Sequence, residues 1–205
     1  WAGSVSVSNG GSKETGRDRI IAALTASDLW GKDHQADVAV TTSLDKPSAV
    51  AQIGVGYRIP AYSWMGVWQA SAAYSTVKGD FGAFSTQGAS TNFSFGYTQQ
   101  LGLLGNYRQS ASVRLDDKLS LPTQINSVAI TGKRRSRPLV IAYALSQVGQ
   151  SASEDYNVEF AVNSGTGQFN DLATFQTEDT RITSAKWQVL RASGTQQRKL
   201  GAWTL

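Results

Sequence analysis

The chain has 205 residues, a formal net charge of +4 and no cysteine; 40 % of its residues are hydrophobic and 10 % are aromatic. No disulfide can form without cysteine, and the charges are scattered rather than gathered on one stripe, which argues against a nucleic-acid partner. No apolar stretch is long enough for a transmembrane helix, so a helical membrane protein is excluded. One large all-β domain over residues 1–205 fits this length and this balance of polar and apolar residues.

Segments of about ten residues alternate apolar with polar side chains, and little except turn residues separates them. The alternation is clearest over residues 35–44 and 92–98. It suits strands with one face toward lipid and the other toward water. We therefore predict an all-β, antiparallel up-and-down meander that forms part of a transmembrane β-barrel, with about ten or eleven strands of a larger barrel. The expected strands span residues 1–8, 19–28, 35–44, 50–59, 67–77, 91–99, 107–116, 138–147, 155–162 and 186–198, with a further strand that begins at 202.

The connections alternate between long and short. Outer-membrane barrels have long extracellular loops and short periplasmic turns, so this alternation predicts which end of each strand faces outward. The long connections, rich in Gly, Ser, Thr and charge, are expected around 9–18, 45–49, 78–90, 117–137 and 163–185. The shorter connections are expected around 29–34, 59–66, 100–106, 148–154 and 199–201.

Aromatic residues gather at the strand ends that carry the short turns. An interfacial girdle of amphipathic rings in a membrane barrel has this arrangement. The alternative is a soluble β-barrel whose aromatic side chains fill a core. The girdle would contain Trp1, Trp30, Tyr57, Tyr62, Trp64, Trp68, Tyr107 and Trp203.

Enzyme and cofactor motifs are missing from the sequence. His34 is the single histidine, and without cysteine it cannot complete the common three-ligand zinc sets. No Gly-x-Ser-x-Gly motif accompanies it for a hydrolase triad. Gly54 and Gly56 lack the third glycine and the helix of a dinucleotide-binding loop, so they are interpreted as part of a strand. We expect no enzyme activity, no cofactor and no metal site.

The sequence contains three clusters of charged residues. Asp116-Asp117 and Glu154-Asp155 are expected to be solvated charges at strand ends. The basic run 133–137 is expected in an extracellular loop or at the outer end of the next strand. Its guanidinium groups suit lipopolysaccharide phosphates or an acidic partner, and a solvated or lumen-lining run is the alternative.

A set of motifs resembles a known family. Residues 9–16 read Asn-Gly-Gly-Ser-Lys-Glu-Thr-Gly and residues 28–33 read Asp-Leu-Trp-Gly-Lys-Asp. Residues 57–60 read Tyr-Arg-Ile-Pro, residues 187–191 read Trp-Gln-Val-Leu-Arg, and residues 200–205 read Leu-Gly-Ala-Trp-Thr-Leu. In this order they resemble the two-partner-secretion TpsB transporters of the haemolysin secretion/activation family.

This resemblance implies an outer-membrane barrel, preceded by periplasmic POTRA modules, that moves an unfolded exoprotein of haemolysin or adhesin type to the bacterial cell surface without ATP. The implied partners are that exoprotein and the outer-membrane lipids, including lipopolysaccharide. Residues 1–205 would then be a partial barrel without the POTRA modules and the C-terminal strands. We expect a curved, open sheet that does not secrete on its own.

The alternation also assigns side chains to the two faces. The side chains expected to face outward are those of Val38, Val40, Ile53, Val55, Phe93, Phe95 and Tyr97. The side chains expected to face the lumen are those of Gln35, Asp37, Gln52, Arg58, Gln69, Ser71, Asn92, Ser94, Ser112, Arg114, Asn157 and Glu159. An outer-membrane porin, a barrel-assembly factor and a soluble adhesin-like β-domain remain the alternatives.

Overall fold

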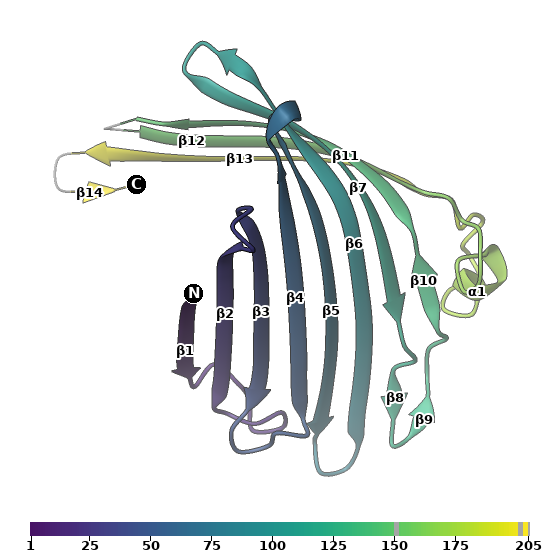
Figure 1. The fold of residues 1–205 in the computed structure, drawn as a ribbon. Coiled ribbons are helices and arrows are strands. Elements are labelled where there is room, and N and C mark those ends of the chain that lie inside the picture. The colour runs from purple at the N-terminus through teal and green to yellow at the C-terminus, as the bar shows by residue number, and fades with distance from the viewer. Residues whose placement is uncertain (150–151, 201–202, 205) are drawn as a thin grey trace.

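The computed structural model describes residues 1–149, 152–200 and 203–204. Its strands form one sheet in the order β1-β2-β3-β4-β5-β6-β7-β11-β12-β13-β14, and every neighbouring pair is antiparallel (Figure 1). The main strands are β1 (Ala2–Ser8), β2 (Arg19–Leu29), β3 (His34–Ser43), β4 (Val50–Ala61), β5 (Gly66–Asp80), β6 (Ser85–Leu104), β7 (Tyr107–Ser120), β11 (Pro138–Val148), β12 (Ala152–Asn163), β13 (Gln188–Leu200) and β14 (Trp203–Thr204). The predicted all-β meander is confirmed.

Two of the expected long loops contain strand. The expectation of a loop over residues 78–90 is wrong, because β5 and β6 continue into this segment and meet at a turn over residues 81–84. The segment 117–137 contains the end of β7 and three short strands. These are β8 (Gln124–Ile125), β9 (Val128–Ala129) and β10 (Arg134–Ser136). Beyond the apolar band both faces of a strand meet water, so the alternation fades although backbone pairing continues.

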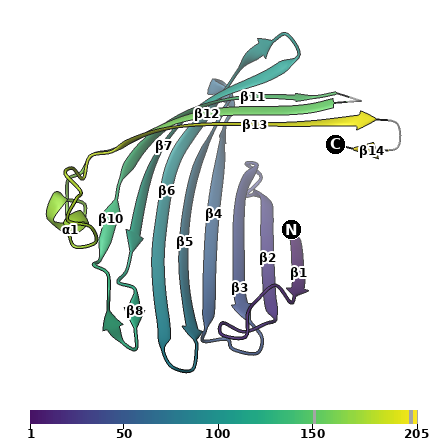
Figure 2. The same cartoon turned by 180° about the vertical axis from the view of Figure 1, so that it is seen from behind.

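The sheet curves into an open trough, with β1 at one edge and β14 at the other (Figures 1 and 2). Within the described residues these two edge strands do not pair. A short helix, α1 (Leu172–Gln176), lies in the connection between β12 and β13, and the 3-10 helix η1 (Tyr62–Trp64) lies between β4 and β5. In the part of the chain that the structure describes, helix is thus confined to the connections. Among the described residues there is no helix with the length and apolar content needed to cross a membrane.

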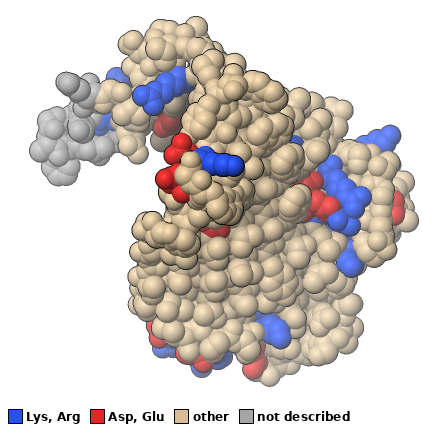
Figure 3. Space-filling view, viewed as in Figure 1, with Lys and Arg blue, Asp and Glu red and all other residues tan. Residues whose placement is uncertain are grey.

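The convex face of the sheet is apolar and exposed. One register row contains Val38, Val55, Ala72 and Phe93, and the side chain of Phe93 is 52 % exposed. Figure 3 shows few charged side chains on the face over β1 to β7; the charges lie along the lower loops, near the upper turns and beside α1. An exposed apolar face of this extent is what a lipid-facing surface requires.

The alternation predicts that seven side chains face outward. Six of the seven side chains are exposed, which confirms it for Val38, Val40, Ile53, Val55, Phe93 and Phe95. The seventh, Tyr97, lies on the same face but is only half-exposed. Its ring lies against those of Trp64 and Trp68, at centroid distances of 6.5 and 4.7 Å.

Candidate functional site

The polar side chains collect on the concave face. Asp37, Gly56, Ser71, Ser94 and Asp116 stand in one register row across β3 to β7. Paired residues in antiparallel strands point to the same side, and every second residue along a strand does so too. By these two rules, all twelve residues expected to face the lumen lie on this one face.

Seven of the twelve line one hollow of about 400 Å³ on this face. They are Asp37, Arg58, Gln69, Ser71, Asn92, Ser94 and Arg114. Gln35 adjoins it, because its amide donates to Asp37 at 3.0 Å. Ser112, Asn157 and Glu159 continue the same face beyond the hollow on β7 and β12, and Gln52 continues it along β4.

Ion pairs cross the concave face from strand to strand. The Asp116 carboxylate accepts hydrogen bonds from Ser94 Oγ and Arg114 Nε, both at 2.8 Å, and Lys118 Nζ lies 3.3 Å away. Arg114 Nη2 also reaches Glu159 at 3.4 Å, across the intervening β11. Arg191 Nη1 of β13 donates to the same carboxylate at 2.7 Å. The face is therefore polar but internally paired.

Sequence reasoning missed three members of this network, namely Asp116, Lys118 and Arg191. The alternation of side chains did indicate two of them, because Arg114, Asp116 and Lys118 follow it along β7. The strand was expected to end at residue 116, so Lys118 was not recognised as part of it. The expectation of solvated charges at strand ends is wrong for Asp116, whose side chain is 2 % exposed, and for Asp117, which is paired on the opposite face. Glu154 also lies within β12 and accepts from Gln196 at 2.6 Å.

The basic run 133–137 is largely engaged within the chain. Arg135 binds Asp117 through Nε and Nη2 at 2.6 and 2.5 Å, and Arg137 Nε reaches the same carboxylate at 3.2 Å. Lys133 lies over the ring of Phe169 and Arg134 over that of Phe175, at 4.7 and 5.7 Å from the ring centroids. These contacts hold the connection between β12 and β13 against β10. The lumen-lining alternative is wrong for Arg135 and Arg137, since Asp117 is on the convex side.

Buried amides fix the same connection. Asn163 and Asn170 are both almost fully buried, and Asn163 Nδ2 donates to Asn170 Oδ1 at 2.8 Å and to the Ala185 carbonyl at 2.9 Å. Asn163 Oδ1 accepts from the backbone N–H of Arg137 at 2.8 Å. Their polar groups are thus satisfied within the loop, so they are structural.

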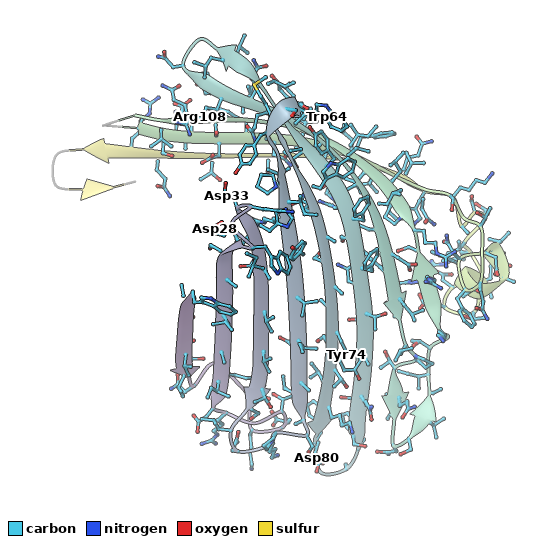
Figure 4. The ribbon with its side chains drawn as sticks, viewed as in Figure 1. Asp28, Asp33, Trp64, Tyr74, Asp80 and Arg108 are labelled. Carbon is cyan, nitrogen blue, oxygen red and sulfur yellow. The ribbon has the colours of Figure 1, made fainter. Side chains whose placement is uncertain are left out.

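Aromatic rings cluster at the ends joined by short turns. Trp30, His34 and Tyr57 lie within 5.7 to 6.3 Å of one another by ring centroids, and His34 Nδ1 lies 2.8 Å from the Tyr57 hydroxyl oxygen. Figure 4 places Asp28, Asp33, Trp64 and Arg108 toward the upper end of the molecule and Asp80 at the lower end. Trp1 is 84 % exposed at the start of the chain. The side chain of Trp203 lies outside the described ones.

The two loop motifs noted in the sequence form tight turns. Gly16 has φ +91°, and a Cβ there would lie 1.9 Å from Ser43 Oγ. Ser43 Oγ and the N–H of Arg17 donate to the Asp45 carboxylate at 2.5 and 3.0 Å. These hydrogen bonds, chiefly that from Ser43, lower the pKa of Asp45 from 3.8 to about 2. In the opposite turn, Asp28 Oδ1 accepts from the N–H of Asp33 at 3.2 Å.

An antiparallel meander with a continuous apolar convex face and a polar, ion-paired concave face defines a wall of a transmembrane β-barrel. Residues 1–203 match the haemolysin secretion/activation protein family ShlB/FhaC/HecB. The chain belongs to this family. Its members are outer-membrane β-barrel transporters of the two-partner secretion type, not enzymes, and the chain is a bacterial outer-membrane protein.

Among solved structures the chain is similar to CdiB from Escherichia coli, with a TM-score of 0.81 and 15 % sequence identity. The match covers 98 % of this chain and 38 % of the CdiB chain. At this identity the likeness shows the fold. Comparison with curated proteins gave no match.

Proposed function

We propose that this chain forms part of the pore wall of a TpsB-type transporter, which moves an unfolded exoprotein of haemolysin or adhesin type to the cell surface. The observation that carries the proposal is the sorting of side chains between the two faces, in a chain of the haemolysin secretion/activation family. The chain spans 38 % of CdiB, so the remaining strands and the periplasmic POTRA modules are proposed to come from the rest of a longer parent protein.

The proposed mechanism is passive. An extended polypeptide carries unpaired backbone N–H and C=O groups, and each would cost several kcal/mol in hydrocarbon. The concave face offers hydroxyl, amide and charged groups instead, including Ser71, Asn92 and Arg58. Because the carboxylates of Asp116 and Glu159 are already paired with arginine and lysine, this part of the wall presents no large field of a single sign to trap a passing segment.

The apolar convex face supports lipid as a second partner in this proposal. Val38, Ile53, Phe93 and Phe95 would meet acyl chains, and the aromatic clusters near the short turns would lie at the periplasmic interface. The ends with the long connections would then lie at the leaflet that holds lipopolysaccharide. No nucleic-acid partner is part of the proposal.

Photo-crosslinking from two adjacent positions tests the transport function. A crosslinking amino acid is placed at Ser71 on the concave face, or at Ala72 on the convex face, in the full parent protein co-expressed with its exoprotein. Crosslinks to the exoprotein from position 71 but not from position 72 are expected. A porin or a barrel-assembly factor would give no exoprotein crosslink from either position, and equal crosslinking from both would contradict the assignment of the faces.

A further inference from the structure

The convex face contains a shallow groove that ends at a charged group. The groove encloses about 580 Å³ and is lined mainly by apolar side chains, with Asp117 and Arg135 also part of its lining. The register explains its shape. Ala72 stands between Val55 and Phe93 in one row, and Thr91 stands between Tyr74 and Leu119 in the next, so small residues alternate with large ones.

The charged end of the groove has more positive than negative groups. Two guanidinium groups share the single Asp117 carboxylate, that of Arg135 within the groove and that of Arg137 beside it. Each guanidinium has five N–H donors. The contacts to Asp117 use two donors of Arg135 and one of Arg137, and within the described residues no other side-chain acceptor binds either group. One positive charge and several donors therefore remain available.

The charged end also lies near a rim of the sheet rather than at its middle. Asp117 is three residues before the last residue of β7, on the side of the long connections. Its side chain and those of Arg135 and Arg137 are between 27 and 39 % exposed. Figure 3 shows a group of blue and red side chains on the convex face beside α1. An amphipathic ligand could therefore reach both parts of the groove from the membrane.

We propose that this groove binds a phosphorylated lipid of the outer leaflet, of the lipid A type. One acyl chain would lie over Ala72 and Thr91, between the rings of Phe93 and Tyr74. A phosphate would accept hydrogen bonds from Arg137 and Arg135, since planar guanidinium groups match phosphate oxygens. This site rests on the proposed orientation of the convex face toward lipid, and it adds a specific lipid to the general contact with the bilayer.

Lipid A binding to the purified full parent protein in detergent tests the site. Arg137→Gln removes the available charge but leaves the bidentate pair of Arg135 with Asp117. We expect it to weaken binding about tenfold, the effect of losing a charged hydrogen bond. Arg137→Lys keeps the charge and should lose less affinity for lipid A than Arg137→Gln does. Arg181→Gln is the matched control, because Arg181 is 89 % exposed and lies in a loop beyond the groove.

The apolar part of the site needs a separate variant. Ala72→Leu fills the groove without changing charge, and it should weaken lipid A binding without lowering the thermal stability of the barrel. Lipid A stripped of its phosphates should bind the unaltered protein at least as weakly as lipid A binds the Arg137→Gln protein, because it also loses the contact with Arg135. Unchanged affinity in Arg137→Gln, or in Ala72→Leu, would overturn the proposal. Full displacement of lipid A by inorganic phosphate would indicate a free-anion site. Because the readout is lipid binding, a failure of secretion would be distinguishable from a failure of this site.

Discussion

At the scale of single residues, Asp116 shows how the concave face is held together. Its carboxylate connects Ser94 of β6 with Arg114 and Lys118 of its own strand, while Arg114 extends the network to Glu159 of β12. Such a group stabilises the wall because its partners stay hydrogen-bonded, and removing one partner leaves the others uncompensated.

Replacement of Asp116 by asparagine should therefore destabilise the barrel. The expected loss is about 1–3 kcal/mol in the free energy of unfolding, because charged hydrogen bonds at a nearly buried site are removed. Denaturant unfolding of the parent protein in lipid vesicles measures it. Asp179→Asn serves as control, since the Asp179–Arg181 pair lies in an exposed loop and is expected to contribute at most about 1 kcal/mol. Equal losses in the two variants would contradict the network.

The two faces should respond differently to a new charge. Phe95 lies near the middle of β6 on the convex face. Phe95→Arg should lower the free energy of unfolding by about 2–4 kcal/mol if lipid surrounds the side chain. Ser71→Arg on the concave face should cost much less, because the side chain meets water and the carboxylates of Asp37 and Asp116. Denaturant unfolding of the parent protein in lipid vesicles compares the two variants. A larger loss for Ser71→Arg would mean that the faces are reversed.

At the scale of elements, sequence patterns predicted strands best where one face of the strand is apolar and the other polar. The spans expected for β3 and β4 agree with the structure to within two residues at each end, because their apolar side chains alternate throughout. The strand expected over residues 91–99 is only the central part of β6 (Ser85–Leu104). The polar ends of β6 pair with neighbouring strands but show no alternation of apolar side chains, so the sequence did not indicate them. The short strands β8 to β10 and the helix α1 depend on contacts with distant segments, such as Arg134 with Phe175. No local pattern specifies such contacts.

The glycines of the two turn motifs should differ in their tolerance of alanine. Gly16→Ala places a Cβ 1.9 Å from Ser43 Oγ at a positive φ, so it should separate the first two long connections. Gly31 also has positive φ, but a Cβ there meets nothing within 4 Å, so Gly31→Ala should cost only about 1–2 kcal/mol of backbone strain. Trypsin added to intact cells should cleave at Arg17 in the first variant only. Protection in both variants would contradict this account of the loop.

The contact between these connections should also depend on pH. The pKa of Asp45 is lowered to about 2 in the folded loop, from an ordinary value of 3.8. Its stabilising contribution is therefore fully present above about pH 4 and is lost as the pH falls toward 2. Limited pepsin digestion between pH 4 and pH 1.5 should show cleavage of residues 9–18 rising near pH 2. Asp45→Asn should abolish this rise, and a rise that persists in it would exclude Asp45 as the cause.

At the scale of the whole molecule, the described residues form a sheet with no central apolar core of its own. Few apolar side chains are buried, and large ones such as Ile141 and Leu190 are more than half exposed. A lipid solvent would make this arrangement stable, since the convex face would then lose contact with water. Strand alternation determines which residues share a face, which is why the residues expected in the lumen all fall on one side of the sheet. It could not show which charges pair across strands, as Arg114 and Glu159 do, because that depends on the curvature of the sheet.

Cysteine accessibility in native outer membranes tests this assignment most directly. The chain has no cysteine, so single cysteines at Ser71 and at its neighbour Ala72 give a matched pair within β5. A charged, membrane-impermeant maleimide should label position 71 in the parent protein at a rate typical of water-exposed thiols and leave position 72 unlabelled. Labelling at position 72 with protection at position 71 would contradict the central claim that the concave face meets water and the convex face meets lipid.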